Sequence, residues 1–108
     1  MSLKRGTVLY RYTIKDNIFR VREGVVDSRD HRLYVNFRDG GQGVMCPRSG
    51  DIGKIQTTLG NLWLDKRDDA MAKKLFIKYE FRRITELREL IKRKEDMIAM
   101  LKEGDIHE

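Results

Sequence analysis

Cysteine, proline and tryptophan each occur only once in this chain of 108 residues. A single cysteine, Cys46, cannot form an intrachain disulfide and is too few for a cysteine-rich zinc module. No run of residues approaches the roughly 18 apolar residues that a transmembrane helix needs, and the N-terminus lacks the apolar segment of a signal peptide. These absences argue against a disulfide-rich secreted scaffold and a membrane span, so we expect a cytoplasmic protein.

Histidine is also scarce, with only His31 and His107 in the chain. A catalytic site needs a constellation of groups, and Cys46 with His31 is the one nucleophile and base that the sequence offers. We interpret Cys46 instead as a small buried strand residue and His31 as a solvated turn residue. The sequence therefore predicts no catalytic residue, no cofactor and no metal, and an enzyme is the least favoured class.

Two glycine-rich segments and one acidic cluster fail as ligand-binding motifs. The segment 50–54 ends in Gly-Lys, but the Walker pattern requires glycine where Arg48 stands and serine or threonine where Ile55 stands. The segment 40–43 leads into an expected strand, whereas a dinucleotide-binding loop opens a helix. The aspartates of 65–69 fit the start of a helix better than a cation site.

Charge is distributed unevenly along the chain. The 23 basic and 17 acidic residues give a net of +6. Residues 1–54 hold 11 basic and 6 acidic side chains, a net of +5, whereas residues 55–108 hold 12 and 11, a net of +1. Arginines interleaved with aromatic residues on a small sheet are typical of nucleic-acid-binding surfaces, although the same arginines could simply cover a solvent face. The residues expected to contact nucleic acid in that case are Arg11, Arg20, Arg22, Arg38 and Arg48.

The first half of the chain predicts a small antiparallel sheet. Apolar and polar residues alternate over 7–15, 18–27 and 33–37, as expected for strands with one buried face. Gly24 predicts a bulge or bend, and Asp39-Gly40 is the strongest hairpin-turn signal. A short strand over 44–46, a loop over 48–61 and a last strand or hinge over 62–64 complete a β domain over residues 1–64. Its expected architecture is an SH3-like sheet or barrel.

The second half of the chain predicts one long helix over 65–103, followed by a frayed tail over 104–108. Neither glycine nor proline occurs between Asp65 and Glu103, Asp65 is a candidate N-cap, and Gly104 follows the last turn. A helix over 68–102 would be roughly 52 Å long at ~1.5 Å per residue, whereas five-residue strands span only ~17–20 Å. We therefore expect the helix through about Phe81 to pack on the sheet, and the remainder to extend beyond it.

Apolar residues on the distal part of this helix recur at alternating steps of three and four residues, with Lys94 interrupting the row. This spacing is typical of a short coiled coil, and an exposed apolar stripe is disfavoured in a monomer. Either a partner helix covers the stripe or the helix breaks near Thr85 and folds back, and no turn residues favour a break. The predicted oligomer interface consists of Ile84, Leu87, Ile91, Ile98 and Leu101.

The segment Leu62-Trp63-Leu64 and the acidic helix start after it resemble the end of small uncharacterised proteins from Firmicutes bacteria and their phages or prophages. The resemblance covers about half the chain, and it implies a β-rich part followed by a long helix with a non-enzymatic or unknown role. It supplies no functional residue.

The sequence as a whole predicts an α+β protein that forms a homo-oligomer, a dimer being favoured, and acts as a non-catalytic binding or adaptor protein with a phage-related role as one option. The alternative is a nucleic-acid-binding protein that uses the arginine-rich half.

Overall fold

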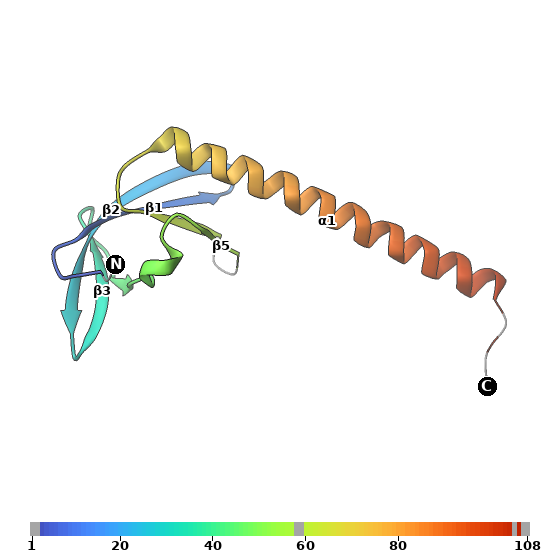
Figure 1. Cartoon of the computed structure of the whole chain (residues 1–108), viewed down its shortest axis with the longest axis horizontal. Coiled ribbons are helices and arrows are strands. Elements are labelled where there is room, and N and C mark those ends of the chain that lie inside the picture. The colour runs from blue at the N-terminus through green and yellow to red at the C-terminus, as the bar shows by residue number, and fades with distance from the viewer. Residues whose placement is uncertain (1–2, 58–59, 105, 107–108) are drawn as a thin grey trace. The chain divides into compact units, whose positions relative to one another are not determined.

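The computed structural model describes residues 3–57, 60–104 and 106. It contains one antiparallel sheet of six strands in the order β4-β3-β2-β1-β6-β5, which curls on itself as a half-barrel (Figure 1). The elements are β1 Val8–Lys15, β2 Ile18–Arg29, β3 Arg32–Phe37, β4 Val44–Met45, the 3₁₀ turn η1 Ser49–Asp51, β5 Ile55–Gln56, β6 Asn61–Leu64 and α1 Asp69–Glu103. This arrangement confirms the predicted α+β class.

Two tight turns connect the long strands β1, β2 and β3. Asp16 and Asn17 have φ of 54° and 61°, and Asp30 and His31 have φ of 52° and 64°. Positive φ at both central residues is the signature of a type I′ turn, which matches the twist of the flanking strands. Aspartate and asparagine tolerate this conformation better than most residues.

The hairpin predicted at Asp39-Gly40 is present between β3 and β4, but its connection is wider than a two-residue type I′ turn. Strand β3 ends at Phe37, β4 begins at Val44, and the two strands pair Val35 with Val44, so a loop of residues 38–43 separates them. Both Gly40 and Gly41 have positive φ, 94° and 88°, and they belong to this wider loop.

Gly24 lies in the middle of β2 and forms no bulge, which was one of the two alternatives predicted there. It pairs in register with Leu9 of β1 and with Phe37 of β3. A Cβ atom at this position would overlap Cγ1 of Val35, so glycine is required because β3 approaches closely. The strand continues past the predicted end at Asp27 to Arg29.

The segment expected to be a loop over 48–61 contains the turn η1 and the short strand β5. β5 pairs with β6, and β6 pairs with β1, so Leu62-Trp63-Leu64 is a strand and not a hinge. Residues 58 and 59 of this segment lie outside the described part of the chain.

Both faces of the sheet bury side chains. Leu9 and Tyr12 are fully buried although they point to opposite sides of β1. We call the side of Leu9 the core face, because Leu9 clusters there with Val26, Val35, Phe37 and Trp63. Alternation along β1 therefore predicted the strand but not its two-sided burial.

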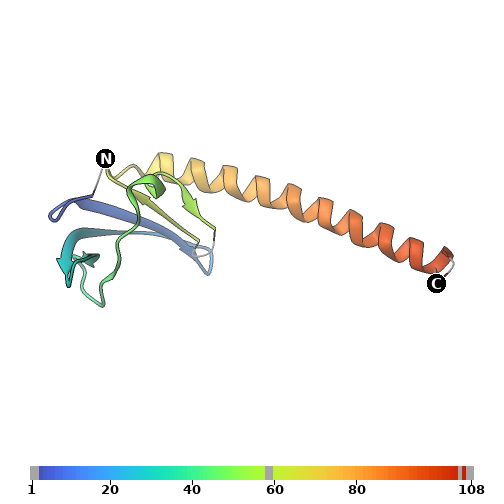
Figure 2. The same cartoon turned by 60° about the horizontal axis from the view of Figure 1, so that its bottom comes forward.

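The helix α1 has 35 residues and runs without interruption (Figure 2). No break occurs at Thr85, so the fold-back alternative is excluded. Asp68, not Asp65, caps the helix: its Oδ1 accepts a hydrogen bond of 3.0 Å from the backbone N–H of Met71. Among the described residues, no helix combines the length and the apolar composition that a membrane span requires.

The chain divides into two compact units, one up to Leu75 and one from Phe76 onward. The first unit holds the sheet and the first turns of α1, in which Ala72 is fully buried. In the second unit, Phe81 is 66% exposed. From the predicted frayed tail, residues 105, 107 and 108 lie outside the described residues, and His107 is one of them.

Candidate functional site

An arginine–aromatic cluster forms on the core face where β1, β2, β3 and β6 come together. Arg11 pairs directly with Arg22 in the β1–β2 ladder and with Trp63 in the β1–β6 ladder. The guanidinium carbon of Arg22 lies 3.8 Å from the centroid of the Phe37 ring, and that of Arg11 lies 4.6 Å from the same centroid. The Phe37 and Trp63 rings are stacked at 6.1 Å, so the two cations rest on a two-ring aromatic base.

The loop over 38–43 neutralises one cation of this cluster. Asp39 accepts hydrogen bonds from Nε and Nη2 of Arg22, the shortest at 2.7 Å, and Nη2 also donates to the carbonyl oxygen of Gly40 at 2.9 Å. The hydrogen bonds from Arg22 lower the pKa of Asp39, and those to Asp39 raise the pKa of Arg22. Arg22 is therefore committed to holding the loop and is less available to a ligand.

The environment of Arg11 lowers the pKa of its guanidinium, whereas the environment of Arg22 raises the pKa of that residue. Burial is the main cause that lowers the pKa of Arg11, and the nearby charge of Arg22 acts in the same direction. Its Nε is buried and has no hydrogen-bond partner among the described residues. The cation is held chiefly by the faces of Phe37 and Trp63, the latter at 5.8 Å, as weakly hydrated guanidinium groups can be.

The other three predicted contact arginines are spread over the sheet half. Arg20 is exposed and pairs with Thr13, which places it on the core face with Arg11 and Arg22. Arg38 lies beside Glu23, to which it forms an ion pair, and so faces the opposite side of the sheet. Arg48 is exposed at the start of η1. The structure thus brings three of the five arginines onto one face.

The sequence alone did not reveal the aromatic base or the role of Asp39. Phe37 and Trp63 are only 6% and 2% exposed, so they lie beneath the arginines and offer no ring face for stacking. The alternation of β3 and β6 could have placed both rings on the face of Arg11, but the strand order was needed to align them.

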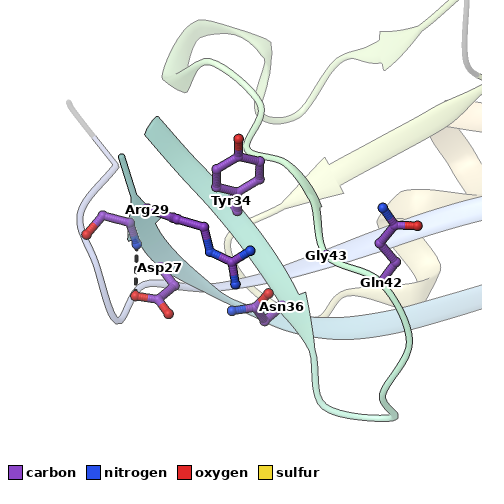
Figure 3. A pocket seen from close by; sticks show the side chains of 7 residues that line it. Asp27, Arg29, Tyr34, Asn36, Gln42 and Gly43 are labelled. Atoms are coloured by element: carbon purple, nitrogen blue, oxygen red, sulfur yellow. Dashed lines mark hydrogen bonds between the residues drawn. The ribbon is translucent and has the colours of Figure 1, made fainter. Parts of the chain in front are cut away.

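A polar hollow of about 180 Å³ lies on the other side of β2 and β3. Tyr34 and Asn36 project into it from β3, Arg29 projects from the end of β2, and Gln42 and Gly43 close it from the loop (Figure 3). The volume is below the roughly 300–1,000 Å³ of typical small-molecule sites.

Cys46 follows β4 instead of belonging to it and is half-buried, so the prediction of a buried residue in a strand over 44–46 was wrong. Burial raises the pKa of the Cys46 thiol, and its Sγ donates a hydrogen bond of 3.4 Å to the carbonyl oxygen of Pro47. His31 lies exposed in the β2–β3 turn. In residues 3–57, 60–104 and 106, no group of three or more His, Cys, Asp or Glu side chains is placed to hold a metal ion.

The predicted interface residues of α1 are all exposed to solvent. Their exposed fractions range from 41% for Ile84 to 70% for Leu101. Leu90 and Met97, 45% and 48% exposed, flank this row. The second unit therefore presents an apolar stripe, interrupted at Lys94, that nothing among the described residues covers.

No protein-family model, curated protein or solved structure matches this chain. The resemblance to small Firmicutes and phage proteins therefore stays a prediction.

Proposed function

We propose that this protein is a non-catalytic binding or adaptor protein whose copies associate through the apolar stripe of α1. The sheet half then presents its arginine-bearing face to an acidic partner. The observation that carries the proposal is the exposure of five regularly spaced Ile and Leu side chains on one uninterrupted helix.

The free-energy cost of exposing the apolar stripe to water favours self-association over an unpaired helix. Exposed apolar patches are rare in monomers because their burial is favourable by roughly 25 cal/mol per Å². The spacing of the stripe matches the seam of a coiled coil, and a second copy carries the same spacing.

The experiment replaces Leu87 and Ile91 together with glutamate and measures mass by light scattering at tens of micromolar. Wild type should have the mass of a dimer, and the double variant that of a monomer. The matched control is the double replacement of Thr85 and Ala99 with glutamate, because both positions lie on the helix away from the stripe; it should remain a dimer. A monomeric wild type over this concentration range would contradict the proposal.

A nucleic-acid-binding function is the alternative, because Arg11, Arg20 and Arg22 share one face. Two features count against nucleic-acid binding by this face. Asp39 neutralises Arg22, and the aromatic rings are buried, so they cannot stack on bases. The remaining contacts would be to phosphates, and even if all three arginines took part the log–log salt slope would be only about −3.

A salt titration of DNA and RNA binding tests the alternative. Replacing the exposed Arg20 with alanine should weaken binding to all sequences and reduce the slope by about one, whereas replacing Lys78, which is exposed on α1, should change it less. If no binding is detected at low salt, nucleic-acid binding is excluded.

A further inference from the structure

The stripe of α1 has a heptad order that specifies how two copies would be oriented. A heptad that starts at Ile77 places isoleucine at every a position, at residues 77, 84, 91 and 98. Leucine occupies two d positions, at residues 87 and 101, and Glu80 and Lys94 occupy the other two. The e and g positions beside this seam carry further charges, among them Arg83, Arg88 and Glu95. All these charged side chains are exposed.

A parallel pair of helices would bring like charges together. A closed two-fold dimer allows no stagger between parallel helices, so each d residue faces its own counterpart. Lys94 would then meet Lys94 of the partner subunit inside the seam. The g residue Arg83 would lie beside the partner's Arg88 at e, and this second repulsion would occur on both sides of the pair.

An antiparallel pair relieves both repulsions, because each a residue then faces a d residue of the other copy. Lys94 no longer lies directly opposite Lys94 of the partner subunit but in the adjacent layer. In one register Leu87 packs against the partner's Ile98 and Ile84 packs against the partner's Leu101. Lys94 faces the partner's Ile91, and its aliphatic stem can cover that side chain while the ammonium reaches solvent. Two-fold symmetry repeats each of these layers.

The charges beside the seam select the same register. Arg88 lies next to the partner's Glu95 at the flanking e positions, and symmetry makes this attraction twofold. A shift of one heptad in one direction would place Arg88 against the partner's Arg88, and a shift in the other direction would place Glu95 against the partner's Glu95. Only the intermediate register combines apolar layers with opposite charges.

We propose that two copies of this chain pair through α1 in antiparallel orientation, with Leu87 against the partner's Ile98 and Arg88 beside the partner's Glu95. The proposal rests on the self-association in the proposed function and adds its orientation and register. Antiparallel pairing places the two sheet-bearing N-terminal ends of α1 at opposite ends of the paired segment.

Charge reversal distinguishes the two orientations by the sign of its effect. Arg88→Glu should weaken the full-length dimer about tenfold in sedimentation equilibrium, because two attractions become repulsions. The helix itself should not suffer, because a glutamate at 88 gains Lys92 as a favourable i,i+4 neighbour. The double variant R88E/E95R should return to within about threefold of wild type.

A parallel dimer predicts the reverse, since Arg88→Glu would relieve the repulsion with the partner's Arg83 and tighten association. Tighter binding by this variant, or a double variant no better than Arg88→Glu, would overturn the antiparallel register while leaving self-association intact. A wild type that is monomeric would instead overturn the proposed function.

Cross-linking gives an independent measure of orientation. With Cys46 replaced by serine, a mixture of full-length I84C and L101C chains should form a disulfide-linked heterodimer, because an antiparallel pair brings these positions together. I84C alone should not cross-link. Efficient cross-linking of I84C with itself would show a parallel pair and overturn the proposal.

Discussion

The hydroxyl of Tyr12 joins the middle of the sheet to the start of α1, and its removal gives the most direct test of the fold. The side chain is fully buried. Its hydroxyl donates a hydrogen bond of 2.7 Å to Oδ1 of Asp69 and accepts one of 3.0 Å from the backbone N–H of Asp68. Burial, and then the hydrogen bond to Asp69, raise the pKa of Tyr12 to about 12, so the hydroxyl remains a donor at neutral pH.

The variant Tyr12→Phe removes both hydrogen bonds and keeps the ring. Hydrogen bonds to charged groups contribute about 1.5–3 kcal/mol, and water can partly replace the lost donor because the Asp69 side chain is 46% exposed. We therefore expect a loss of about 2 kcal/mol in the free energy of unfolding, and a fall in Tm of about 10 °C.

Urea unfolding followed by the fluorescence of the single tryptophan, Trp63, measures this loss. All variants must be compared at one protein concentration, because association makes stability concentration-dependent. Tyr10→Phe is the matched control: its hydroxyl donates to Glu23 at 2.9 Å in a less buried position, so its loss should be much smaller. Equal losses for the two variants would refute the inference that Tyr12 anchors the helix.

Three further predictions concern the same unit. Asp68→Ala should cost about 1 kcal/mol as loss of an N-cap, whereas Asp65→Ala should change stability by less than about 0.5 kcal/mol; urea midpoints distinguish them. Gly24→Ala should cost about 1–3 kcal/mol through overlap with β3, while Gly50→Ala, in open space, should be well tolerated in thermal unfolding. The hydrogen bond from Tyr12 is the main cause that lowers the pKa of Asp69. The stability that the ionised Asp69 contributes is therefore present above about pH 4 and is lost as the pH falls through the lowered pKa. The variant Asp69→Asn should lose less stability than wild type on acidification.

The sequence predicted the helix well because its signals are local. The absence of glycine and proline, the helical spacing and the acidic first turn all lie within the segment itself. The observed helix, Asp69–Glu103, ends at the predicted residue and begins four residues later than the predicted range 65–103. The cap was misplaced because Asp65 and Asp68 are chemically alike. Only the route of the chain from β6 decides which aspartate meets the first free N–H groups.

The turns were harder to predict because their geometry depends on distant residues. Asp39-Gly40 has the composition of a type I′ turn, but Arg22 holds Asp39 through a contact across 17 residues of sequence. That ion pair, with the hydrogen bond from Arg22 to Gly40, stabilises a wider loop. Turn propensity is a local preference, and here a tertiary contact overrides it.

The arginine face illustrates why net charge alone is a weak guide to partners. Three arginines of the sheet half that add to its net charge form ion pairs in the described part of the chain. The pairs are Arg5–Asp27, Arg22–Asp39 and Arg38–Glu23. Each pair leaves the net charge of the half unchanged but reduces the field that a phosphate would meet locally.

Strand order then decides which charges remain effective on one face. Arg20 is exposed there, while the guanidinium of Arg11 rests on rings that are themselves buried. A partner of this face would meet a small number of cations at fixed positions, not a diffuse basic surface. Such a face favours recognition of particular acidic groups over extended phosphate binding, which is why we rank a binding or adaptor role above nucleic-acid binding.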